Sequence, residues 1–279
     1  MPTRSRPIQP GMDLIYHTDD EGEVIDLLIT ATPGCIACIQ ELWGLPVPPR
    51  CPVYVMTSWL SFIFRSAPWY MKIILGCYFL FWWYDTVKRW HILSGWTLRY
   101  LNYPAVGIKP PRLLAKMNRR IADLISSDEQ GMHKRMRNLL CHELTHAFTF
   151  KHRLPMWLNE GLAILTAEKY IGSQTVPPAT LQAIRQRAGK VSPVAYAQLY
   201  NKQHADIAYH YTRGYWITRY LHETHPDLLR TLLAQPSSRE LITDRVAAAL
   251  GMTRKQFWVE IDGLIVEHFA DQLTSVGPV

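Results

Sequence analysis

The amino-acid sequence predicts an α+β fold that is mainly α-helical, with a small sheet-bearing N-terminal lobe and a helical C-terminal lobe. Two observations carry this prediction. Short runs rich in β-branched and aromatic residues occur in the first part of the chain, whereas apolar residues recur at three- and four-residue spacing through the last two thirds. The chain of 279 residues is 48% hydrophobic and 19% charged, which is typical of a globular protein and excludes a disordered one.

The expected strands lie near the N-terminus. Residues 14–29 contain two apolar runs on either side of Asp19-Asp20-Glu21-Gly22, a pattern that predicts two strands joined by a turn. Four prolines between residues 46 and 52 then interrupt the chain before residues 53–57, whose sequence Val-Tyr-Val-Met-Thr predicts a further strand.

Residues 59–96 are unusually rich in aromatic side chains. A membrane-spanning helix needs about 20 mostly apolar residues. The uncharged stretch of residues 73–84 is shorter and is bounded by Lys72 and Asp85. We therefore expect these side chains to be buried within the N-terminal lobe, with contact to a membrane as the alternative.

Helical periodicity begins after Pro110-Pro111. Residues 113–125 predict an amphipathic surface helix. Further helices are expected over residues 136–150, 158–170, 181–187, 207–222 and 257–269. We place the boundary between an N-terminal lobe (residues 1–110) and a helical lobe (residues 111–279) at this change in pattern.

The segment His142-Glu143-Leu144-Thr145-His146 has the HExxH pattern within a predicted helix. Residues i and i+4 of a helix lie on one face, so His142 and His146 can bind the same metal ion. Glu143 then projects beside that ion, where its carboxylate can accept a proton from water. The motif thus predicts two metal ligands and a general base.

A catalytic zinc site needs a third protein ligand, and two residues compete for this role. Glu160 lies at the start of a second predicted helix that begins after Pro155 and could fold back on the first. His152 follows His146 at the spacing found in metzincins, but that pattern has Gly at the position occupied here by Thr149. A β-branched residue resists positive φ, which favours Glu160 and leaves His152 as an exposed surface residue.

The HExxH motif together with Trp157-Leu158-Asn159-Glu160-Gly161-Leu162-Ala163 resembles the gluzincin metallopeptidases of the peptidase MA-like kind. The resemblance implies a thermolysin-like zincin fold, a Zn²⁺ ion held by His142, His146 and Glu160, and an endopeptidase that acts on peptides or proteins. The sequence also departs from that pattern. Ile164 stands where the thermolysin-like subgroup has an Asp, and there is no Gly-x-Met-Glu-Asn segment of the membrane-alanyl aminopeptidases.

Acyl transfer also needs a group that stabilises the oxyanion. Tyr209, His210 and Tyr211 are the candidates, and the resemblance favours Tyr211 because a Gly and a helix ending in Tyr220-Leu221 follow it. The predicted catalytic residues are therefore Glu143 and Tyr211.

The remaining features give weaker indications. The net charge of +7 names no partner, and the basic residues Lys134, Arg135 and Arg137 are expected on a solvated helix face rather than on nucleic acid. Five cysteines, including the lone pair Cys35 and Cys38, predict free thiols in a reducing compartment, and no secretory signal is apparent, so a cytoplasmic location is expected. The alternative to a peptidase is a non-catalytic metal-binding or membrane-associated interaction module on the same fold.

Overall fold

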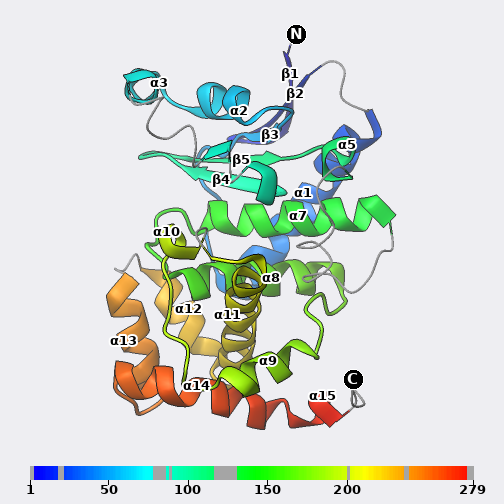
Figure 1. Cartoon of the computed structure of the whole chain (residues 1–279). Helices are drawn as coiled ribbons and strands as arrows, with labels where there is room; N and C mark the ends of the chain where they lie inside the picture. The colour runs from blue at the N-terminus through cyan, green and yellow to red at the C-terminus, as the bar shows by residue number, and fades with distance from the viewer. Residues whose placement is uncertain are drawn as a thin grey trace.

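The computed structural model describes residues 3–17, 22–77, 86–87, 90–115, 131–199, 202–235 and 239–274. The protein is an α+β structure in which a five-stranded sheet covers one side of a larger helical assembly (Figure 1). A long helix, α7 (Gly131–Phe148), runs between the sheet and the helices that follow it in the chain, whereas α2 (Trp59–Ser66) and α3 (Trp69–Cys77) lie on the opposite side of the sheet. The predicted class, mixed and mainly helical, is confirmed.

The sheet has the strand order β1-β2-β3-β5-β4. Its strands are β1 (Thr3–Gln9), β2 (Met12–His17), β3 (Val53–Val55), β4 (Gly95–Arg99) and β5 (Pro104–Ile108). The three central strands are parallel, whereas β1 and β4 run antiparallel to their neighbours at the two edges. The strand predicted at residues 53–57 is confirmed, and the edge strand β4 lies against α7.

The hairpin predicted over residues 14–29 is wrong in its second half. Residues from Gly22 onward form helix α1 (Gly22–Trp43), whose buried side chains recur at helical spacing from Val24 to Ile39. The hairpin is instead formed by β1 and β2, with Gly11 in the turn at φ 78°, a conformation that favours glycine. Two apolar runs around an acidic turn do not reveal that the second run continues for six helical turns.

Helix α1 is long and apolar enough to cross a membrane by length and composition alone, yet half of its most apolar stretch is buried inside the protein. Its side chains belong to the main hydrophobic core together with residues of α7 and α8. The core thus contains residues from both sides of residue 110, and the predicted division into two lobes stays a prediction.

The prediction that the aromatic side chains of residues 59–96 are buried is only partly correct. Helix α2 (Trp59–Ser66) buries Trp59, and it buries Phe62 against residues of the sheet. Helix α3 (Trp69–Cys77), however, has no buried residue, and Trp69 is 74% exposed. Residues 78–85 and 88–89 of this segment lie outside the described residues. The prediction failed at α3 because aromatic density indicates a need for burial without identifying a surface that could provide it.

The part of the chain after residue 130 contains the helices that the periodicity predicted over residues 136–150, 158–170, 181–187, 207–222 and 257–269. They are α7, α8 (Met156–Ile171), α9 (Thr180–Arg187), α11 (His204–Thr224) and α14 (Arg254–His268). Shorter helices join or extend them: α5 (Pro111–Leu114), α10 (Tyr196–Leu199), α12 (Pro226–Ala234), α13 (Arg239–Ala249) and α15 (Ala270–Thr274). The amphipathic helix predicted over residues 113–125 lies almost entirely outside the described residues.

Two glycines allow α8 and α11 to approach each other closely. A Cβ atom added to Gly161 would lie 2.0 Å from the Thr218 hydroxyl oxygen, and one added to Gly214 would lie 2.5 Å from the Trp157 carbonyl oxygen. Only residues without a side chain fit this crossing. Because Gly161 follows Glu160 directly, the crossing with α11 also fixes which side of α8 faces α7.

Candidate metal centre

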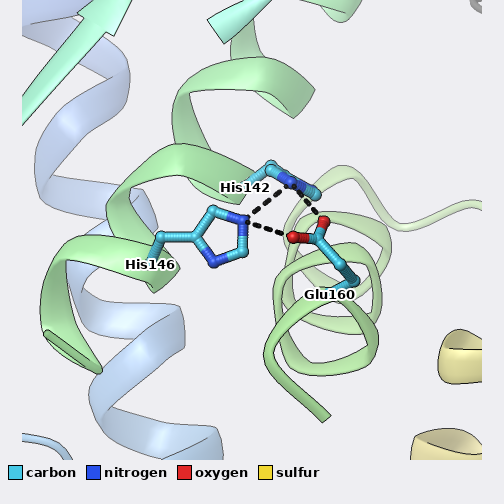
Figure 2. Close-up of side chains that lie close together, drawn as sticks. All are labelled: His142, His146 and Glu160. Carbon is cyan, nitrogen blue, oxygen red and sulfur yellow. Dashed lines mark hydrogen bonds and ion pairs between the residues drawn. The ribbon is translucent and has the colours of Figure 1, made fainter. Parts of the chain in front are cut away.

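His142, His146 and Glu160 come together between helices α7 and α8 (Figure 2). The two imidazoles project from successive turns of α7, and the carboxylate reaches them from the first turns of α8, which begins after Pro155. The Nε2 atoms of His142 and His146 are 3.1 Å apart. Glu160 places Oε2 3.4 Å from His142 Nε2 and Oε1 3.5 Å from His146 Nε2.

These distances fit a single bound metal ion. Zinc lies about 2.0 to 2.2 Å from nitrogen and oxygen ligands, so two ligand atoms of a tetrahedral site are about 3.3 to 3.5 Å apart. Glu160 is 3% exposed, and within the described part of the chain its Oε2 atom accepts no hydrogen bond. An oxygen so placed, facing two imidazole nitrogens, has the surroundings of a metal ligand. The group could therefore hold a metal ion.

The three side chains also perturb each other electrostatically. Burial raises the pKa of Glu160, but the positive charges of His146 and His142 beside its carboxylate outweigh this effect and hold the pKa well below its usual range. Burial lowers the pKa of His142, but the close, negatively charged carboxylate of Glu160 raises it by more, so the pKa of His142 is increased overall. A negatively charged carboxylate at this position favours the binding of a cation between the two imidazole rings.

Glu143 lies next to these residues on α7 and contacts the edge strand β4. The Thr97 hydroxyl donates a hydrogen bond to Glu143 Oε2 at 2.6 Å and also lies 3.0 Å from the Glu143 carbonyl oxygen. A Cβ atom at Gly95 would lie 2.6 Å from Glu143 Cγ and Oε1, so a larger residue there would displace the Glu143 side chain. Strand β4 thus holds the carboxylate in one place.

Glu160 has a partner that the sequence did not indicate. The Tyr196 hydroxyl, from helix α10, donates a hydrogen bond to Glu160 Oε1. Asn159 donates to the Tyr196 oxygen at 2.6 Å and in turn accepts a hydrogen bond at 2.7 Å from Arg99 on β4. No motif surrounds Tyr196, and α10 is a four-residue helix with no periodic signal, so sequence reasoning had no means of finding it.

A cavity of about 440 Å³ opens over this centre. His142, Glu143, His146 and Glu160 contribute to its lining, and so do four residues of β4. Among the described strands, β4 has a hydrogen-bonded neighbour on one side only. The cavity therefore lies between the helices and the free edge of a strand.

Of the three oxyanion candidates, Tyr211 alone lines the cavity. Tyr209 packs against the guanidinium of Arg187 and the ring of His210, and its buried hydroxyl has no hydrogen-bond partner among the described residues. Burial, helped by the charge of Arg213, lowers the pKa of His210 to about 4. The role of Tyr211 as the oxyanion donor stays a prediction.

His152 does not join the metal-binding group, and the expectation that it is exposed is wrong. It is buried, and its carbonyl oxygen accepts a hydrogen bond from Arg99 at 3.3 Å. Thr149 stays in the final turn of the α7 segment, where its hydroxyl lies 3.1 Å from the Thr145 carbonyl oxygen. Within the described residues no non-glycine residue has positive φ, as the argument from Thr149 required.

Three further expectations concern neighbours of the centre. Cys141 points away from His142 into the core beside Cys35, and all five cysteines are free thiols. Arg135 is half-buried and lines the cavity, and its assignment to a solvated helix face stays a prediction. Ile164 also lines the cavity, and within the described part of the chain the buried Nδ1 atom of His146 lacks a hydrogen-bond partner, which is consistent with the absence of an acidic residue at position 164.

Comparison with known proteins adds nothing to this geometry: the chain matches no protein-family model and no curated protein sequence.

Proposed function

We propose that the protein is a zinc-dependent peptidase of the gluzincin type with a thermolysin-like arrangement of its helices. One observation carries the proposal. Two imidazoles and one carboxylate lie at the distances that a tetrahedral metal site requires, and a further carboxylate, that of Glu143, is held beside them in a cavity. Two histidines and one glutamate form the ligand set of hydrolytic zinc sites, which leave the fourth position open.

A zinc ion held by His142, His146 and Glu160 would supply a Lewis acid for the hydrolysis of a peptide bond. Glu143 accepts the proton of the attacking water and passes it to the leaving amine. Thr97 orients the carboxylate through the hydrogen bond at 2.6 Å. Tyr211, which lines the cavity, donates a hydrogen bond from its hydroxyl to the oxyanion.

The free edge of β4 supports a peptide as the substrate. An extended peptide can pair with an exposed strand edge through main-chain hydrogen bonds. Gly95, Trp96, Thr97 and Arg99 of β4 all line the cavity, so a peptide paired with this strand would pass over the metal centre. A module that only binds metal has no need for this combination of strand edge and general base. The five free cysteines support a location inside the cell.

The test is a metal analysis combined with digestion of a peptide library. We expect one equivalent of zinc in the parent protein, cleavage of library peptides by the loaded protein, loss of cleavage after chelation and recovery on re-addition of zinc. The matched control is His152→Gln, which removes a neighbouring histidine outside the ligand group and should retain zinc, whereas His146→Gln should lose it. Stoichiometric zinc without cleavage of any peptide would favour the non-catalytic module instead.

A further inference from the structure

The cavity over the metal centre carries an excess of positive charge. Three arginines line it: Arg99, Arg135 and Arg239. The acidic residues in its described lining are Glu143 and Glu160, which the proposed reaction already uses as base and metal ligand. Positive charge that lines a substrate cavity and has no acidic partner there favours the binding of an anionic group.

Arg99 lies at one end of the cavity, and Arg239, which also lines it, is near enough for its charge to act on Arg99. Arg99 ends strand β4 and contacts the His152 carbonyl oxygen, beyond the C-terminal end of α7. Desolvation lowers the pKa of Arg99 most, Tyr196 and Glu160 raise it, and the charge of Arg239 has a smaller lowering effect. Within the described part of the chain neither guanidinium forms an ion pair with a carboxylate. Both positive charges can therefore bind an anion that enters the cavity.

Arg135 belongs to the opposite end. It precedes His142 by seven residues on α7, which corresponds to about 10 Å along the helix axis. The metal centre lies between Arg135 and the pair formed by Arg99 and Arg239. The paired arginines are therefore the better candidates for a site that recognises one anionic group.

We propose that Arg99 and Arg239 bind a carboxylate of the substrate and so direct the enzyme to peptides that are acidic near the scissile bond. The inference rests on the proposed function, because it names the substrate class of the same cavity. Carboxylates are the ordinary anions of peptides, and guanidinium groups bind them through paired, charge-assisted hydrogen bonds. Arg99 has donors left for this purpose, since its hydrogen bonds to Asn159 and His152 use two of its N–H groups.

The carboxylate has two sources, an Asp or Glu side chain and the C-terminus of a short peptide. To separate them, calorimetric titrations use the zinc-loaded full chain carrying Glu143→Gln, so that binding is measured without turnover. The probes are alanine hexapeptides blocked at both ends, with one Glu or one Gln at each position in turn. The all-alanine hexapeptide is added with a free and with an amidated C-terminus.

We expect a carboxylate at one position to strengthen binding about tenfold over its neutral twin. Preference for Glu over Gln in the blocked set assigns the site to a side chain. Preference for the free acid over the amide assigns it to the C-terminus. Equal binding within every pair would overturn the proposal.

Variants of Arg239 test whether the preference for a carboxylate arises at Arg99 and Arg239. Arg239 is exposed and has no hydrogen bond among the described residues, so Arg239→Ala should fold normally and abolish the preference, while Arg239→Lys should retain part of it. Arg185→Ala removes the same charge from the exposed face of α9, outside the cavity, and should leave the preference intact. A preference that survives Arg239→Ala would overturn the assignment.

Hydrolysis of the same peptides by the parent protein separates this inference from the proposed function. Cleavage of acidic and neutral peptides at the same rate, with equal binding, would sustain the peptidase and overturn the carboxylate site. Tight binding of acidic peptides that are never cleaved would support the carboxylate site and contradict the proposed peptidase activity.

Discussion

The hydroxyl of Thr97 on the edge strand β4 donates a hydrogen bond of 2.6 Å to the carboxylate of Glu143 on helix α7. The contact joins two segments that are 46 residues apart in the sequence. A general base must be held in place if it is to take a proton along one defined path. The sheet thus acts on the site through this hydroxyl.

Replacing Thr97 by Val should lower kcat by about ten- to a hundredfold, because a carboxylate without this hydrogen bond is free to leave the productive position. KM and zinc content should change little, since Thr97 contacts none of the three metal ligands. Steady-state kinetics on a library-derived peptide, with the zinc content measured in parallel, tests whether kcat falls while KM and zinc content stay nearly constant. Thr97→Ser keeps the hydroxyl and should retain most of the activity; an equal loss in both variants would show that the methyl group matters instead.

Tyr196→Phe should weaken zinc binding by about ten- to a hundredfold, because partners that hydrogen-bond to a metal ligand typically contribute this much to affinity. The measurement is a competition between the protein and a chelator of known affinity. Tyr209→Phe makes the same chemical change on α11 at a hydroxyl that has no partner among the described residues, and should leave the affinity unchanged. Unaltered affinity in the Tyr196 variant would mean that its hydrogen bond to Glu160 disappears when the metal binds.

The sequence predicted the group of His142, His146 and Glu160, which could hold a metal ion, from local patterns. His142 and His146 are one turn apart, and Pro155 marks the start of the helix that carries Glu160. Thr97, Tyr196 and Arg99 reach the same place from elements distant in the chain, so only the packing of β4 and α10 against α7 and α8 reveals them. Local patterns thus predicted the three candidate ligands. Their hydrogen-bonded neighbours are brought to the site by tertiary contacts, which such patterns do not reveal.

The same dependence on tertiary contacts explains the errors in the predicted fold. The five helices of the C-terminal lobe were predicted because each buries one side against a common core, which makes its apolar spacing regular. Helix α1 was mistaken for a strand since a window of eight residues does not separate the two periods. The exposure of Trp69 on α3 could not be predicted because burial depends on what packs beside a helix.

His210 should make the protein less stable in mild acid. Its pKa is about 4 in the folded protein, against an ordinary value of 6.5, because burial and the charges of Arg213 and Lys202 disfavour the protonated ring. The unfolded chain therefore binds a proton more readily between these two values. The stabilisation is complete above pH 6.5, falls as the pH decreases towards 4 and is lost below it.

Urea unfolding of the metal-free protein at several pH values checks this expectation. His210→Phe should reduce the decrease in the free energy of unfolding between pH 6.5 and 4 by at most about 3 kcal/mol, at about 1.4 kcal/mol per pKa unit. The metal ligands titrate equally in both proteins and cancel in the difference. Parallel stability curves for parent and variant would contradict the assigned cause.

The central claim is that Glu143 activates water beside a metal held by His142, His146 and Glu160. The most direct test is the rate of peptide cleavage by Glu143→Gln at a zinc content equal to that of the parent. The amide keeps the shape of the side chain but cannot accept the proton, so we expect full zinc occupancy and a cleavage rate at least about a hundredfold lower. Cleavage by the variant at the parent rate, with zinc bound in both, would contradict the account.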